Sequence, residues 1–201
     1  MNFLSNQYFE NNNNLKKETR EILFYYRGNK ILLTTNTGIF SKSYVDFGTQ
    51  QLLKNINLTQ GTTSVLDVGC GYGVIGITIA KTYEFSKVDM IDINSRAVEI
   101  TKENIIKNNV NNASCFISNI YENIVSQYDL IVSNPPIRAG KQVVHSILAD
   151  AYQHLNIGGS IIVVIQKKQG APSTMKKLKE VFGNVTVVDR EKGYYILKSI
   201  K

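Results

Sequence analysis

The pattern of hydrophobic and polar residues changes character near residue 64. Before that point, two runs rich in β-branched and aromatic residues cover 21–26 and 30–35. Arg27-Gly28-Asn29 separates them, which predicts a hairpin with a short glycine turn. A loop over 36–43 and a short helix over 49–56 follow. From Ser64 onward, apolar runs of strand length alternate with stretches of helical period, so we expect a series of βα units.

The alternating part predicts five strands and then a final pair of strands. The five cover 65–68, 87–93, 113–118, 128–133 and 160–166, and the pair covers 185–188 and 194–197. Helices are expected over 74–81, 95–108, 142–155 and 174–182, with Gly158-Gly159 ending the third and Ser173 capping the fourth. Alternating βα units imply a mostly parallel sheet with helices on both faces. The final pair is joined by too few residues for a parallel crossover, so it must run antiparallel and complete a seven-stranded sheet.

The size and composition are those of one globular domain. The chain has 201 residues, 43% of them hydrophobic and 19% charged, enough to bury a core without disulfides or metals. We expect one domain over 1–201, with a hairpin and loop extension at 1–45 and the core at 46–201. Neither a signal peptide nor an apolar stretch of membrane-spanning length is evident, so we expect a cytoplasmic protein. Cys70 and Cys115 have neither disulfide nor zinc spacing, so no metal is expected.

The charge narrows the choice of partner. A net charge of +7 and a pI near 9.3 favour an anionic partner, and nucleic acid is the commonest one. Many basic cytosolic proteins bind no nucleic acid, so charge alone does not decide.

A glycine-dense turn follows the strand predicted over 65–68. Gly71, Gly73 and Gly76 satisfy GxGxxG, and Asp92 ends the next strand, which would fit a dinucleotide site. Asp67, however, precedes the glycines, and its carboxylate would be an awkward neighbour for a pyrophosphate. It suits a ligand with an ammonium group, such as the methionine end of S-adenosylmethionine, with Asp92 accepting from the ribose diol. The competing interpretations are a helix cap for Asp67 and a solvated strand end for Asp92.

The strand over 128–133 runs into Asn134-Pro135-Pro136-Ile137. Prolines offer carbonyls but no backbone N–H, and their φ is fixed. The Asn134 amide oxygen and the Pro135 carbonyl can therefore form a rigid pair of acceptors for the two hydrogens of a flat NH2 group. This leaves the nitrogen lone pair free, as methylation of an exocyclic amine or amide requires. The competing interpretation is a simple turn that ends the strand.

These motifs together resemble the class I S-adenosylmethionine-dependent methyltransferases. Within them the chain is similar to the RsmC-type ribosomal RNA guanine-N2 methyltransferases, particularly the short single-domain bacterial members. The resemblance runs from about Tyr8 to the C-terminus. It rests on 38–42 with 45–48, on 66–73, on 92–94 with Arg96-Ala97, on 134–141 and on 166–173.

The resemblance implies a Rossmann-like class I methyltransferase fold and S-adenosylmethionine as the cofactor. Asp92 would hold the ribose and Asn119 would lie at the adenine edge, while Asn134 would contact both the cofactor and the target amine. The residues implied to wrap the methionine and ribose side are Asp67, Gly69, Gly71 and Gly73. The implied catalytic residues are Asn134, Pro135 and Pro136. The implied substrate-binding residues are Phe40, Ile137, Arg138, Lys141 and Lys168.

Ile137 favours one acceptor among the amines that such a site could serve. Adenine-N6 and glutamine-N5 enzymes commonly carry an aromatic residue after the two prolines, and isoleucine cannot stack as an aromatic ring does. Guanine N2 of ribosomal RNA, free or in the small subunit, is therefore the expected target. We expect Arg138, Lys141, Lys167 and Lys168 to form an RNA-facing rim, and His145 and His154 to be ordinary helix residues. Methylation of adenine N6 or of a protein glutamine N5 remains an open alternative, as do a nicotinamide-dependent oxidoreductase and a non-catalytic RNA-binding assembly factor.

Overall fold

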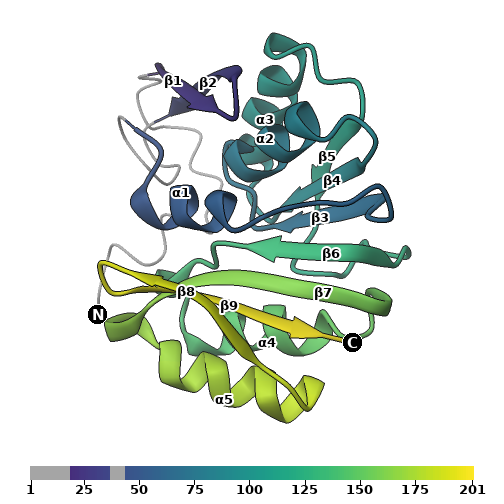
Figure 1. The fold of residues 1–201 in the computed structure, drawn as a ribbon. Coiled ribbons are helices and arrows are strands. Elements are labelled where there is room, and N and C mark those ends of the chain that lie inside the picture. Colours follow the sequence, from purple (N-terminus) through teal and green to yellow (C-terminus); the bar gives the residue numbers. More distant parts are fainter. Residues whose placement is uncertain (1–18, 37–43) are drawn as a thin grey trace.

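A seven-stranded sheet runs through the centre of the molecule in the order β5-β4-β3-β6-β7-β9-β8 (Figure 1). The computed structural model describes residues 19–36 and 44–201. β9 is antiparallel to both of its neighbours and the other pairings are parallel, which confirms the predicted sheet. The strands are β3 (Ser64–Val68), β4 (Lys87–Asp92), β5 (Ala113–Ile117), β6 (Tyr128–Ser133), β7 (Leu155–Gln166), β8 (Thr186–Glu191) and β9 (Tyr194–Ile200).

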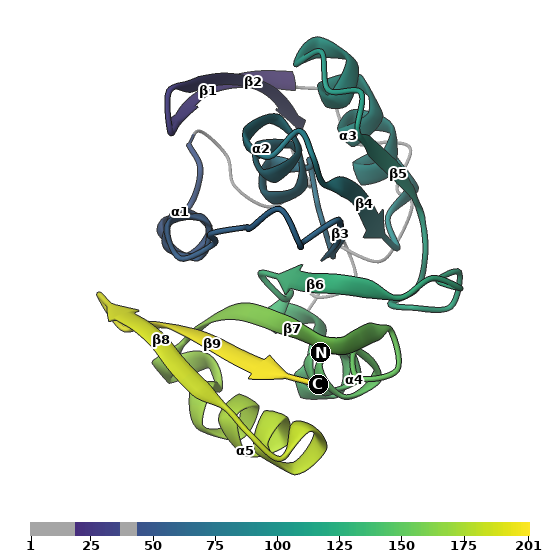
Figure 2. The same cartoon turned by 45° about the vertical axis from the view of Figure 1, so that its right-hand side comes forward.

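Helices cover both faces of the sheet, and each face has its own hydrophobic core. On one face lie α1 (Phe47–Lys54), α2 (Val74–Thr82) and α3 (Ser95–Lys107), and on the other α4 (Lys141–Asp150) and α5 (Ala171–Phe182) (Figure 2). Successive strand residues point to opposite faces. In β6, accordingly, Ile131 packs in the core of α4 and α5, whereas Val132 packs in the core of the other three helices. This explains why β6 is apolar at the consecutive positions 130–132 rather than at every second position.

The predicted hairpin is formed by β1 (Thr19–Tyr26) and β2 (Asn29–Asn36), a separate antiparallel sheet above α2 and α3 (Figure 1). Asn104 of α3 and Asn108, the C-cap residue of that helix, bind its edge. Asn104 accepts from the Thr34 N–H (2.7 Å) and donates to the Thr34 carbonyl (2.9 Å). Asn108 makes the same pair of hydrogen bonds with Leu32, at 2.9 and 2.8 Å. The distance between residues four apart along a helix is thus close to the distance between residues two apart along a strand, so both asparagines reach the hairpin.

The prediction for the helix over 142–155 was wrong at its C-terminal end. α4 ends at Asp150, and Leu155 already pairs with Tyr128 as the first residue of β7. Gly158-Gly159 therefore lies inside a strand, where the pairing with β6 shifts register. A Cβ on Gly159 would lie 3.0 Å from the Tyr128 carbonyl oxygen, so the glycine permits the close approach of β6. His154 consequently lies in the turn before β7, stacked on Tyr121 with ring centroids 4.7 Å apart.

The predicted starts of two other helices also differ from the structure. α5 begins at Ala171 with Gly170 as N-cap, so Ser173 lies inside the helix, where its hydroxyl donates to the Gly170 carbonyl (2.9 Å). α1 begins at Phe47 because Asp46 caps it, two residues before the predicted start. No helix among residues 19–36 and 44–201 is long and apolar enough to span a membrane.

Candidate active site

The turn after β3 is held in one shape by hydrogen bonds from the neighbouring strand. Gly69, Gly71 and Gly73 have φ of +73°, +59° and +86°, which side chains other than glycine adopt with strain. The Gly69 N–H donates to the Ile91 carbonyl (2.9 Å), and the Gly71 N–H donates to Asp92 Oδ2 (2.9 Å). The end of β4 therefore fixes the loop, and the loop leads into the N-terminus of α2.

Asp67 lies beneath this loop and is fully buried. Its Oδ2 accepts from the N–H of Gly76 in the first turn of α2 (3.0 Å). One oxygen of Asp67 therefore acts as a helix cap, which was the competing interpretation of this residue. Its Oδ1 has no hydrogen-bond partner among the residues that the structure describes. Burial raises the pKa of Asp67 to about 7, with a smaller contribution from the nearby Asp92 carboxylate. A buried carboxyl oxygen without a partner suits a ligand that brings an ammonium group.

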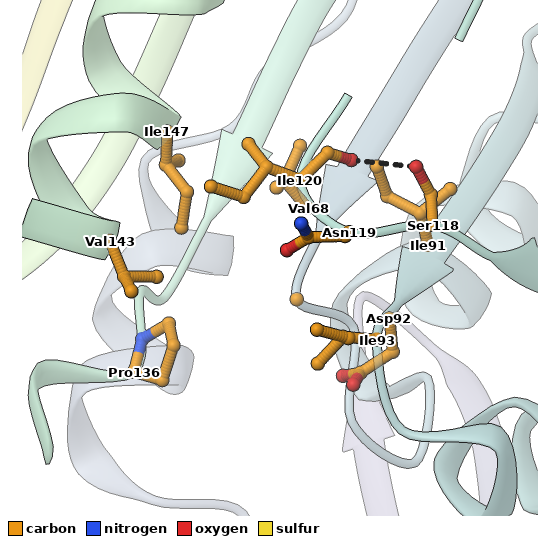
Figure 3. Close-up of a pocket in the computed structure, with 11 residues that line it drawn as sticks. Val68, Ile91, Asp92, Ile93, Ser118, Asn119, Ile120, Pro136, Val143 and Ile147 are labelled. Carbon is orange, nitrogen blue, oxygen red and sulfur yellow. Dashed lines mark hydrogen bonds between the residues drawn. The ribbon is translucent and has the colours of Figure 1, made fainter. Parts of the chain in front are cut away.

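A pocket opens at the carboxyl ends of β3, β4 and β6, beside the glycine turn (Figure 3). About 440 Å³ of space lies between its walls, including space that is open to solvent. Of the predicted cofactor residues, Gly69, Asp92 and Asn119 line it, together with Pro136 of the Asn-Pro-Pro segment. The remaining lining residues are Val68, Ile91, Ile93, Ser118, Ile120, Val143 and Ile147.

The polar groups of the pocket are already oriented by the protein. Asp92 is buried, and its Oδ1 accepts from the Asn94 N–H (2.9 Å) while Oδ2 accepts from Gly71. Asn119 is exposed and donates through Nδ2 to Glu122 Oε1 (2.7 Å), which reserves its Oδ1 as an acceptor. Figure 3 shows the Asn119 amide between Ile120 and the side chains of Asp92 and Ile93. The arrangement offers polar acceptors along one wall and apolar side chains on the others.

Asn134 follows the last residue of β6 and lies next to this pocket through Pro135 and Pro136. Its Nδ2 donates to Thr49 Oγ1 (2.9 Å) and to Asp46 Oδ1 (3.4 Å) at the start of α1. Its Oδ1 accepts no hydrogen bond from the described part of the chain. The Pro136 carbonyl accepts from the Ala139 N–H (2.9 Å). The acceptors left at this strand end are the Asn134 amide oxygen and the Pro135 carbonyl, the pair expected from the sequence.

The other predicted substrate-binding residues differ in burial and in whether the structure describes them. Phe40 and the side chain of Arg138 lie outside the described residues. Ile137 is partly buried against the core of α4 and α5. Lys141 is exposed at the start of α4, and Lys168 is exposed in the short 3₁₀ helix (Lys167–Gln169) that follows β7.

Two groups of residues have roles at the site that were not predicted from the sequence. The first is Asp46, which stands in the motif 45–48 without a role of its own, and Thr49; they hold Asn134 from 88 and 85 positions away in the chain. The second is the apolar lining from Ile93, Ile120 and Val143. Among these apolar residues, only Ile93 could have been suspected from the sequence, because a large apolar residue directly follows the strand-ending Asp92. In the structure the Ile93 side chain is 37% exposed. Within residues 19–36 and 44–201, no three His, Cys, Asp or Glu side chains gather to hold a metal ion.

Comparison with known sequences gives matches over nearly the whole chain. Residues 30–198 match the family model of the methyltransferase small domain. The chain is 40% identical over 200 residues to the uncharacterized protein YbxB of Bacillus subtilis, covering 98% of this chain and 100% of that protein. It is 31% identical over 180 residues to the ribosomal RNA small subunit methyltransferase C of Citrobacter koseri, covering 87% of this chain. The match covers 51% of that protein, so the chain spans about half its length.

Comparison with solved structures identifies the same architecture. The 16S rRNA N2 G1207 methyltransferase (RsmC) of T. thermophilus, in complex with AdoMet and guanosine, has a TM-score of 0.81 at 23% identity. That match covers 91% of this chain and 50% of the other. TYW2 of M. jannaschii, in complex with AdoMet, has a TM-score of 0.65 at 17% identity and covers 90% and 84%. At these identities the comparison shows the shared fold, with the sheet topology predicted from the sequence.

Proposed function

Because this chain belongs to the methyltransferase small domain family, we propose that it is an S-adenosylmethionine-dependent methyltransferase acting on guanine N2 of small-subunit ribosomal RNA. The observation that carries the proposal is the Asn134 amide, whose nitrogen is held by Asp46 and Thr49 while its oxygen stays available. Relatives named ribosomal RNA small subunit methyltransferase C support the RNA target at 31% identity. A structural neighbour with AdoMet and guanosine supports the pairing of this fold with that acceptor.

The residues around the pocket fit the cofactor. When bound, S-adenosylmethionine supplies an electrophilic methyl group on a sulfonium. Asp67 offers its unpartnered Oδ1 to the ammonium end. Asp92 lines the pocket, and its carboxylate is the kind of acceptor that the ribose hydroxyls require. The Asn119 oxygen can accept from the adenine amine, and Ile93 and Ile120 provide apolar contact for a flat ring.

The Asn-Pro-Pro segment would hold the amine that receives the methyl group. The Asn134 Oδ1 and the Pro135 carbonyl accept its two hydrogens, which leaves the nitrogen lone pair directed away from both. As positive charge develops on the nitrogen, these fixed dipoles stabilise it without reorganisation. The leaving group is a good one, so orientation and exclusion of water supply most of the rate and no tuned general base is needed.

Basic residues at the same end of the sheet provide the RNA-facing rim. Lys141, Lys167 and Lys168 are exposed where β6 and β7 end, close in sequence to Arg138 and the Asn-Pro-Pro segment. Phosphate contacts of this kind position an RNA strand without reading its sequence. The proposed partner is therefore ribosomal RNA or the small subunit, with Ile137 beside the target base.

The proposal is tested with radiolabelled S-adenosylmethionine and small ribosomal subunits from cells that lack this protein. We expect one new N2-methylguanosine by mass spectrometry of the nucleosides. Asn134→Ala should abolish transfer while the cofactor Kd stays within about threefold, because the cofactor keeps its proposed contacts with Asp67, Asp92 and Asn119. Asn111→Ala, at an exposed loop position, is the matched control and should stay active. Turnover retained by Asn134→Ala would refute the catalytic assignment, and N6-methyladenosine or methylated glutamine as product would replace guanine as acceptor.

A further inference from the structure

The Asn134 side chain is attached to the start of α1 in a way that permits only one orientation of its amide. We propose that Asp46 and Thr49 are positioning residues that lock Asn134 as a hydrogen-bond acceptor, so that the site admits amine hydrogens and rejects a carbonyl oxygen. The inference rests on the proposed function. It adds to it two residues of another helix and a rule for what the site can bind.

The direction of the lock follows from the chemistry of Asp46. Its carboxylate Oδ1 has no hydrogen to donate, so only the NH2 side of the Asn134 amide can face it, at 3.4 Å. The flipped amide would bring its oxygen against the Asp46 carboxylate oxygen, with no hydrogen between them. The second contact, to Thr49 Oγ1 (2.9 Å), does not set the direction. A hydroxyl can donate or accept and would tolerate either orientation, so Asp46 decides the direction and Thr49 supplies the shorter contact.

The anchor itself is rigid, which a positioning role requires. Asp46 Oδ1 also accepts the Thr49 N–H (3.1 Å), so one carboxylate oxygen caps α1 and binds Asn134. The first turn of α1 is closely packed, because a Cβ on Gly48 would lie only 2.8 Å from the Tyr194 ring. Thr49 is 2% exposed. The helix N-terminus, the strand end and the amide therefore move as one unit.

The lock also strengthens the acceptor that it orients. An amide that donates to a carboxylate is polarised, and polarised hydrogen-bond chains reinforce each other in a low-dielectric site. The Asn134 oxygen then carries more negative charge where the amine becomes positive during transfer. Loss of the lock should lower kcat more than it raises KM, because the benefit grows as the reaction proceeds.

The test compares two substitutions at one buried position. Thr49→Val is isosteric and removes the hydroxyl, whereas Thr49→Ser keeps it. With small subunits from cells lacking the protein as acceptor, we expect Thr49→Val to lower kcat by about 10- to 100-fold, as small misplacements of catalytic groups do. KM for the subunits and Kd for S-adenosylmethionine should stay within about threefold. Thr49→Ser should recover most of the loss.

A second threonine separates positioning from a loss of packing. Thr78 in α2 is fully buried and donates to the Val74 carbonyl (2.6 Å), away from Asn134. Thr78→Val should keep kcat at the wild-type value. Asp46→Asn keeps an oxygen that can cap α1, but it removes the charge and adds an NH2 group that can donate to the Asn134 oxygen. This variant should therefore lower kcat, and it provides a test even if Thr49→Val folds poorly.

The outcomes distinguish this inference from the proposed function. If Thr49→Val and Asp46→Asn both keep the wild-type kcat while Asn134→Ala is inactive, Asp46 and Thr49 do not position Asn134. The proposed function is unaffected by that result. An equal loss of kcat in Thr78→Val assigns the effect to packing and also overturns it. Activity retained by Asn134→Ala removes the proposed function and the lock together.

Discussion

Asn104 joins the hairpin to the glycine turn, and its removal should damage both stability and cofactor binding. The side chain is fully buried in α3. It binds the N–H and carbonyl of Thr34 in β2 and also donates to the Tyr72 carbonyl, between Gly71 and Gly73 (2.9 Å). Asn104→Ala leaves three backbone groups without their partner.

The magnitude follows from the burial of those groups. An unsatisfied buried donor or acceptor costs about 1–3 kcal/mol, so three should lower the free energy of unfolding by about 3 kcal/mol or more. This is a large share of the roughly 5–15 kcal/mol that stabilises a domain. Because the Tyr72 carbonyl also loses its anchor, the turn loosens, and we expect the cofactor Kd to rise about tenfold, or about 1.4 kcal/mol.

Urea unfolding and calorimetric titration with S-adenosylmethionine measure the two effects. Asn108→Ala is the matched control, because Asn108 also makes three hydrogen bonds, two with Leu32 and one to the Asn104 carbonyl, but none with the glycine turn. It should lose comparable stability while its Kd stays within about threefold. Equal Kd values for the two variants, measured where both are folded, would refute the coupling of hairpin and turn through Asn104.

Two further predictions concern charge. Burial holds the pKa of Asp67 at about 7, above its usual 3.8, so the native state of the cofactor-free protein binds this proton more tightly than the unfolded state. The free energy of unfolding should then fall as pH rises from about 4 to 7. Urea unfolding at several pH values should show that this fall vanishes in Asp67→Asn. If the variant keeps the same dependence of unfolding free energy on pH, the effect does not come from Asp67. Lys141→Glu combined with Lys168→Glu should weaken RNA binding and reduce its salt slope by about one unit per lost phosphate contact. Lys176→Glu on the exposed face of α5 is the control, and an unchanged slope in the double variant would count against the rim.

The sequence predicted those parts of the molecule that local pattern and composition determine. The bounds of β6 are those expected, because its apolar run ends just before Asn134 and the proline pair. The parallel central strands and the antiparallel final pair followed from the alternation of elements and the short final connection. The end of α4 was misplaced because apolar spacing continues to Leu155 even though that residue pairs in a sheet.

The site was predictable to the extent that its residues stand in compact motifs. Gly69, Asp92 and Pro136 stand in such motifs, Asn119 was implied by the family resemblance, and all four line the pocket. The roles of Asp46 and Thr49 were not predicted, because they depend on a contact with Asn134 that only the folded chain creates. Asn104 is similar, since nothing near it in the sequence indicates that it binds Thr34 or Tyr72.

The two asparagines of α3 have a consequence beyond the stability of the hairpin. A free strand edge is a template on which another polypeptide can add a strand, and two-stranded sheets offer such edges readily. On β2 the outward N–H and carbonyl groups of Leu32 and Thr34 are occupied by amide side chains that imitate a neighbouring strand. Replacing either asparagine would leave one N–H and one carbonyl of β2 without the partner that imitates a neighbouring strand, so the α3 end of the helix layer protects this edge as an added strand would.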